Sequence, residues 1–98
     1  MERSLVLLAT QRALLGAITP NMKAITIDYN SSSYVLRIYF SSQPSEEEVE
    51  LLKEITSEVS ADIPSIETFK EEAIVTKEQS NKLERLKEWV YMQYYSPI

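Results

Sequence analysis

The sequence predicts a single α+β domain over residues 1–98. We expect the order α-β-β-α-β-β, with two helices on one face of a four-stranded antiparallel sheet. Length is the first reason, because 98 residues can form one hydrophobic core but not two. Composition is the second, since 44% hydrophobic and 26% charged residues are typical of a globular chain. The third is the mixture of helical and strictly alternating spacing along the chain.

The first helix is predicted over residues 3–16, which are rich in Leu, Ala, Gln and Arg. Side chains recur there at the three- and four-residue intervals of one helix face. The members of this stripe are Leu7, Leu8, Gln11, Leu14, Leu15 and Ile18. Gly16, the only glycine in the chain, suits the left-handed position after a helix, and residues 19–21 then turn the chain.

Residues 24–29 and 34–40 are predicted to pair as an antiparallel hairpin. In each segment, β-branched and aromatic side chains follow the two-residue period of a strand. The connection at residues 30–33 contains Asn and Ser but no Gly. We therefore expect a four-residue loop instead of a tight two-residue turn.

The second helix has the clearest start, because Ser45 followed by Glu48 is a capping-box sequence. Pro64 marks its end. One face is predicted to be a core stripe, made of Val49, Leu52, Ile55, Thr56, Val59 and Ile63. The opposite face carries four outward carboxylates at spacings of three, four and four residues, namely Glu47, Glu50, Glu54 and Glu58.

The last third of the chain is predicted to add two strands. Residues 66–76 fit a third strand, and its alternation places on one face Glu67, Phe69, Glu71, Ala73 and Val75. Residues 77–88 fit either a short helix or a loop. Residues 89–95 favour a fourth strand, although a helix is the alternative because helical spacing also relates Leu83, Leu86, Val90 and Tyr94.

Negative charge is concentrated in the middle of the chain. Residues 41–72 hold ten of the fifteen acidic residues and two of the ten basic ones, a net charge of −8 within a total of −5. Such a field attracts a positively charged partner and repels nucleic acid. We therefore expect a protein partner with a basic surface and no binding to nucleic acid.

Several chemistries are disfavoured by composition. The chain has neither His nor Cys, so it lacks the commonest general base, the commonest metal ligand and the thiol nucleophile. A single glycine leaves no glycine-rich phosphate loop. The glutamates of the second helix are predicted to face water, where paired carboxylates do not acquire the separated pKa values that acid–base catalysis needs. We expect no enzyme, no metal and no cofactor.

Two sets of side chains are candidates for contact with a partner. The acidic set comprises Glu47, Glu50, Glu54, Glu58, Glu67 and Glu71. The second set lies on strands of a sheet face that we expect to be open, with Arg37 and Tyr39 on one strand face and Trp89, Tyr91 and Tyr95 on another. Tyr, Trp and Arg dominate the energetics of many protein interfaces. For either set, a solvated helix face or ordinary sheet packing is the simpler alternative.

The start of the chain indicates a protein that remains in the cytoplasm. Residues 5–9 and 13–18 are largely apolar, but residues 10–12 interrupt them. No basic segment precedes the apolar run, as a signal peptide would require. No segment has the apolar length of a membrane-spanning helix.

Five short motifs resemble those of small bacterial immunity proteins from contact-dependent growth inhibition and related polymorphic toxin systems. They are A-L-L-G-x-x-T-P-N-M-[KR]-A-I at 13–25, L-R-I-Y-F at 36–40, P-S-E-E-E at 44–48, I-E-T-F-K-E-E at 66–72 and W-V-Y at 89–91. Residues 79–87 depart from the pattern by being longer and more charged. None of the motifs carries defined chemistry, so the resemblance implies a fold and a functional class.

Two functions remain open at this point. The first is an immunity protein that neutralises a toxin, in particular a nuclease, by docking acidic and tyrosine side chains on its basic cleft. The second is a structural or adaptor subunit that forms a homodimer or hetero-oligomer through the open sheet face. Tyrosines next to the acids favour the first function, and a separate apolar patch favours the second.

Overall fold

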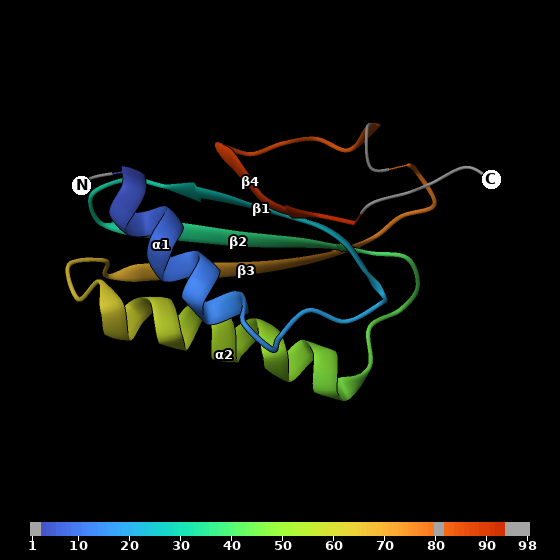
Figure 1. The fold of residues 1–98 in the computed structure, drawn as a ribbon, viewed down its shortest axis with the longest axis horizontal. Coiled ribbons are helices and arrows are strands. Elements are labelled where there is room, and N and C mark those ends of the chain that lie inside the picture. Colours follow the sequence, from blue (N-terminus) through green and yellow to red (C-terminus); the bar gives the residue numbers. More distant parts are fainter. Residues whose placement is uncertain (1–2, 80–81, 94–98) are drawn as a thin grey trace.

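The computed structural model describes residues 3–79 and 82–93 (Figure 1). Two helices and four strands follow the predicted order α-β-β-α-β-β. Their bounds are α1 Arg3–Leu14, β1 Met22–Tyr29, β2 Ser33–Phe40, α2 Glu46–Asp62, β3 Thr68–Val75 and β4 Glu88–Met92. The α+β class is thereby confirmed.

The sheet is mixed, so the prediction of an antiparallel sheet is wrong in part. Its strand order is β3-β2-β1-β4, in which β1 pairs antiparallel with both β2 and β4 while β3 runs parallel to β2. Helix α2 is the reason. Its 17 residues span about 25 Å, close to the length of about 26 Å of the eight-residue β2. The helix returns the chain to the start of β2, so β3 begins there and runs the same way.

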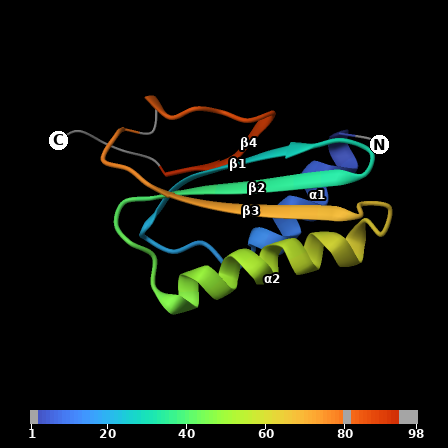
Figure 2. The ribbon, with the colours of Figure 1, turned by 180° about the vertical axis from the view of Figure 1, so that it is seen from behind.

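Both helices lie on one face of the sheet, as predicted. Helix α1 is in front of the strands in Figure 1 and behind them in Figure 2. Thr10 of α1 shares a hydrogen bond of 2.8 Å with the Tyr34 hydroxyl of β2. Thr56 of α2 donates a hydrogen bond to Glu71 of β3. Glu71 pairs with Leu36 of β2, whose side chain lies on the same sheet face as that of Tyr34. Helix α2 therefore lies on the same face as α1. The core between the layers is built around fully buried aliphatic and aromatic side chains of β1 and β2, namely Met22, Ile25, Ile27, Tyr34, Leu36, Ile38 and Phe40.

The buried face of α1 overlaps the predicted stripe only in part, since Leu14 is buried and Leu7 packs partly against the core as expected. The residues that it buries are Val6, Ala9, Thr10, Ala13 and Leu14. Small alanines allow the helix to approach the sheet closely, so this face packs better than the bulkier leucine stripe. Leu8, Leu15 and Ile18 consequently remain exposed. Gly16 has the predicted left-handed conformation, with φ of 76°.

Helix α2 begins with the predicted capping box. The Ser45 hydroxyl accepts from the Glu48 amide, and the Glu48 carboxylate accepts from the Ser45 amide. Leu52, Ile55, Thr56 and Val59 are buried as predicted. Val49 is 39% exposed, so its place in the core stripe was wrong.

The connection between β3 and β4 passes over the sheet face opposite the helices. The Tyr39 hydroxyl donates to the Glu84 carbonyl over 2.7 Å, and the Leu86 amide donates to the Thr26 hydroxyl over 3.0 Å. Of the two alternatives for residues 77–88, the described part is a loop with a short turn at Lys82 and no α-helix. The fourth strand is confirmed for Glu88–Met92, while the last part of the predicted strand, including Tyr95, lies outside the described residues.

Candidate functional site

The outer face of α2 carries a continuous row of carboxylates. The four predicted side chains, Glu47, Glu50, Glu54 and Glu58, are all exposed. The helix adds Glu46 and Asp62, which the sequence reading left out of the stripe although they keep its four-residue spacing. We call the exposed residues spaced by four the acidic row, which consists of Glu46, Glu50, Glu54, Glu58 and Asp62. The row is about 24 Å long at the rise of an α-helix.

Little positive charge relieves the acidic row. Lys53 lies 3.8 Å from the Glu50 carboxylate, and both side chains are largely exposed. Such a surface pair contributes at most about 1 kcal/mol. Like charges four residues apart destabilise a helix by about 0.2–0.5 kcal/mol for each pair. Repulsion along the row therefore destabilises α2, so helix stability does not explain why these positions carry carboxylates.

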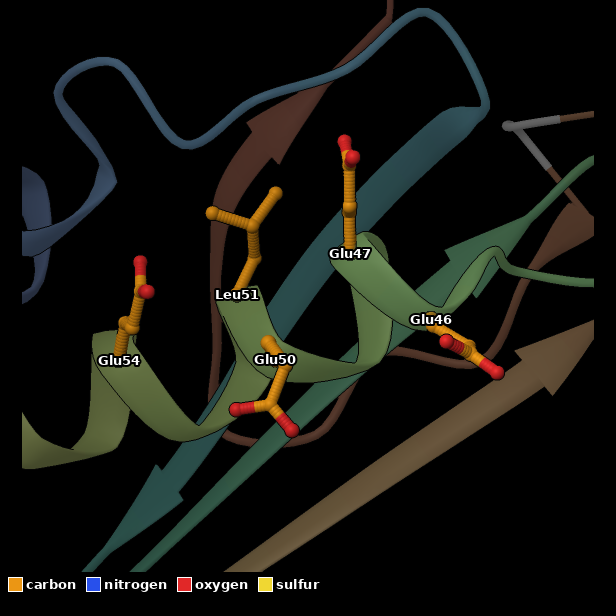
Figure 3. A pocket seen from close by; sticks show the side chains of 5 residues that line it. All are labelled: Glu46, Glu47, Glu50, Leu51 and Glu54. Carbon is orange, nitrogen blue, oxygen red and sulfur yellow. The ribbon is translucent and has the colours of Figure 1, made fainter.

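A shallow hollow of about 390 Å³ lies over the first half of the row (Figure 3). It is lined by Glu46, Glu47, Glu50, Leu51 and Glu54. In Figure 3, Glu47, Leu51 and Glu54 point to one side of the helix, while Glu46 and Glu50 point to the other. Leu51 packs partly against the core and is the only apolar lining residue. The hollow thus offers one apolar contact surrounded by acceptors for basic side chains.

One member of the central acidic cluster is not available to a partner. Glu48 is only 8% exposed. Its carboxylate accepts hydrogen bonds from the Thr19 hydroxyl, the Asn21 amide and the Ser45 amide. Burial alone raises the pKa of Glu48, but these hydrogen bonds outweigh it and hold the pKa below its ordinary value. Glu48 therefore joins the start of α2 to the α1–β1 turn.

The two acids predicted beyond α2 lie near the start and middle of β3. Glu67 is exposed and precedes the strand, so it belongs to the α2–β3 connection and not to the predicted strand. Its amide donates to the Ser32 carbonyl over 2.8 Å. Glu71 is also exposed and lies on the helix side of the sheet, where it accepts from Thr56. The structure thus brings Glu71 next to α2.

On the opposite sheet face, Arg37 is the centre of an ion-pair cluster. Its guanidinium lies 2.7 Å from Glu72 and 3.2 Å from Glu84, and it donates to the Tyr39 hydroxyl over 3.1 Å. Burial disfavours the charged guanidinium, but the hydrogen bonds from it to Tyr39, Glu72 and Glu84 leave the pKa of Arg37 raised. The hydrogen bond from Arg37 holds the pKa of Glu72 below its ordinary value, with Lys70 adding to the effect. The cluster ties β2, β3 and the β3–β4 connection together.

The sheet face that we expected to be open is therefore covered over β1 and β2. Tyr39 is 4% exposed, with its ring 6.3 Å from that of Trp89, so it offers almost no surface to a partner. Arg37 and Tyr39 do share a strand face. Trp89 and Tyr91 do not, because a register shift pairs Trp89 with Thr26 and Tyr91 with Ile25 on the other side. Tyr91 packs partly against the core.

No group of three or more acidic side chains in residues 3–79 and 82–93 is arranged to hold a metal ion. Within the same ranges, neither helix combines the length and apolarity that a membrane crossing requires.

Comparison with known protein families matches residues 3–94 to the family described as MafI2 immunity protein. The match confirms the resemblance to bacterial immunity-type proteins of polymorphic toxin systems. No curated protein matches the sequence. Because the family match spans nearly the whole chain, including both helices and all four strands, the chain belongs to the MafI2 immunity protein family.

Proposed function

We propose that this protein neutralises a cognate toxin by docking the acidic row of α2 on a basic surface of the toxin. Family membership supports the immunity role and a protein toxin as the partner. The observation that supports this particular surface is the exposure of all five carboxylates of the row, of which Glu50 alone, among the described residues, forms an ion pair, with Lys53.

The acidic row suits fast capture of a toxin. Surface charges of one sign raise the rate of encounter with an oppositely charged partner, and salt reduces this effect. An immunity protein has to bind before its toxin acts, so a high association rate is an advantage. Leu51 in the hollow supplies an apolar contact that charge alone does not, and apolar burial slows dissociation.

A nuclease is the toxin class that we propose, acting in the cytoplasm where this protein would meet it. Enzymes that bind nucleic acid carry basic clefts, because the phosphate backbone dominates their affinity. The acidic row places five carboxylates along about 24 Å of the helix, each turned by about 40° around the axis from the one before. Such a series of negative charges imitates the repeated charge of a nucleic acid strand and suits a basic cleft.

The test measures association kinetics with the toxin domain that co-purifies with the tagged protein from its native bacterium. A triple variant, Glu50→Lys, Glu54→Lys and Glu58→Lys, should associate about 10–100 times more slowly at low salt. It should also lose most of its salt dependence while its circular dichroism spectrum stays unchanged. Unchanged association kinetics would exclude the acidic row as the docking surface. Glu54→Lys alone should slow association by a smaller factor, and Glu78→Lys, at an exposed carboxylate outside the row, is the matched control for that single reversal.

The second candidate function is a structural subunit of a homo-oligomer, and one observation favours it. Leu5, Leu8, Leu15 and Ile18 are exposed on and just after α1, which makes an apolar surface apart from the acidic row. Sedimentation of the wild type across a 100-fold concentration range separates the two functions. A dimer that Leu8→Glu converts to a monomer would favour the structural role.

A further inference from the structure

The outer edge of β3 is not paired with any strand among the residues that the structure describes. β3 is the last strand in the order β3-β2-β1-β4. Within residues 3–79 and 82–93, its only ladder is the parallel one with β2. β3 is eight residues long, which is enough to pair with a complete strand of another protein.

The hydrogen bonds to β2 identify the backbone groups at this edge. The amides of Thr68 and Thr76 donate to the carbonyls of Ser32 and Phe40. In a parallel ladder, alternate residues direct both their N–H and C=O groups to the same neighbour, so the even-numbered residues of β3 face β2. The outward N–H and C=O groups therefore belong to Phe69, Glu71, Ala73 and Val75.

Helix α2 lies alongside this edge of β3. Figures 1 and 2 both show α2 displaced to the outer side of β3. The hydrogen bond from Thr56 to Glu71 shows which flank of α2 faces the strand. Val49 is two turns before Thr56 on this flank, toward the end of β3 that carries Val75, because helix and strand run in opposite directions. Val49 is 39% exposed and Val75 is 45% exposed.

We infer that the free edge of β3 accepts an extended segment of the toxin, which adds a fifth strand to the sheet. The inference rests on the toxin partner of the proposed function and names a second part of its interface. Added strands obtain affinity from main-chain hydrogen bonds and specificity from alternate side chains. Val49 and Val75 receive apolar side chains of that segment, and Glu46 and Glu71 favour basic ones.

A second copy of this chain fits the edge less well than a basic segment does. Antiparallel pairing of two β3 strands about a two-fold axis would place two α2 helices, each with an acidic row, on the same side of the joined sheet. A pairing centred on Glu71 would also oppose two identical carboxylates, which is destabilising. Lys70, Glu71 and Glu72 in the strand are typical of charged edges that resist self-pairing.

The first test is residue-resolved amide hydrogen exchange in the wild-type protein, free and saturated with a catalytically inactive form of the co-purified toxin domain. The amides of Phe69, Glu71, Ala73 and Val75 should exchange at least ten times more slowly in the complex. The amides of Lys70 and Glu72 bond to β2 and should be protected in both states. A saturated complex in which the four outward amides exchange as in the free protein would overturn the inference.

The second test uses Ala73→Pro, which removes an outward N–H without touching a bond to β2. Ala73→Ser keeps the N–H and is the matched control. The proline variant should bind the toxin domain at least ten times more weakly, and the serine variant should bind like the wild type. Equal affinities of a folded proline variant and the wild type would overturn the inference. The exchange experiment decides the question if the proline variant does not fold.

The tests of strand pairing at β3 and the test of the acidic row can fail independently of each other. Charge reversal in the acidic row changes the association rate and its salt dependence, whereas the edge pairing is detected in the complex of the unaltered protein at equilibrium. Alternate protection of the β3 amides in the free protein at high concentration, without toxin, would identify a second copy as the occupant and overturn the inference.

Discussion

Two groups of glutamates in this molecule have opposite surroundings. The acidic row on α2 is exposed to solvent, and Lys53 pairs with one of its members, Glu50. Glu48, Glu72 and Glu88, in contrast, each accept hydrogen bonds from several donors and have pKa values below the ordinary range. The first group leaves its charge available to a partner, and the second uses its charge to join segments that are distant in the sequence.

Glu47 and Glu48 show that adjacent glutamates can belong to different groups. The two residues are adjacent, yet Glu47 is exposed at the hollow while Glu48 is buried against Thr19 and Asn21. A rotation of about 100° per residue along the helix separates a solvent-facing charge from a buried one. Counting acids along the chain therefore overstates the charge that a partner meets.

Among the contacts of the second group, Glu48, Glu72 and Glu88, the largest effect on stability is expected from loss of Arg37, the partner of Glu72. Arg37→Met should lower the free energy of unfolding by about 2–3 kcal/mol, because Glu72 loses its nearest partner in a largely buried site. Urea denaturation measures the change. Glu84→Gln is the control, since that side chain is 78% exposed and its pair with Arg37 should contribute under about 1 kcal/mol. Equal losses in the two variants would show that the cluster does not depend on the buried pair.

A smaller effect is expected at Glu48. Glu48→Ala should lower the free energy of unfolding by about 2 kcal/mol, because it removes half of the capping box, leaves the Thr19 hydroxyl without its acceptor and takes one of two acceptors from the Asn21 amide. Glu48→Gln retains the amide carbonyl as an acceptor and should cost less. Thermal unfolding of both variants beside the wild type measures the difference. A Glu48→Ala protein as stable as the wild type would contradict this role.

The same residue predicts a pH dependence. The folded-state pKa of Glu48 is lowered by its hydrogen bonds, so its charged form contributes stability that is complete above the unfolded pKa and is lost as the pH falls through the folded pKa. The stability difference between wild type and Glu48→Gln should be complete at neutral pH and should shrink in acid. Urea titrations at a series of pH values measure it, and a difference that grows in acid would reverse the assignment.

The smallest effect is expected in the acidic row. Glu54→Gln removes one charge from two repulsive pairs, with Glu50 and Glu58, and should raise the free energy of unfolding by a few tenths of a kcal/mol. Chemical denaturation at low and high salt should show that the gain falls as salt screens the repulsion. A decrease of 1 kcal/mol or more in the free energy of unfolding would mean that Glu54, like Glu48 and Glu72, stabilises the fold.

The prediction from sequence was most accurate where the signals were local. Ser45 and Glu48 determine the start of α2 through contacts within one turn, and Gly16 has the predicted left-handed conformation. Exposure of Glu47, Glu50, Glu54 and Glu58 follows from helical spacing alone. Residues 77–88 were ambiguous because helical and irregular chains share their charged composition.

Errors arose where distant segments meet. Leu8 and Leu15 satisfied the helical period but lie outside, because the alanine face of α1 packs more closely on the sheet. Tyr39 was expected on an open face, which residues 84–89 instead cover. Trp89 and Tyr91 were expected on one face, but a bulge between them reverses the alternation.

The sequence by itself determined the order of both helices and the first three strands, the start of α2 and the exposure of its outer glutamates, because each depends on neighbours within a few residues. Tertiary structure alone decided that β3 lies parallel to β2 at a free edge, which carboxylates are paired, and which tyrosines are covered. These features depend on strand pairing and on contacts between residues far apart in the chain, and local spacing carries no information about either.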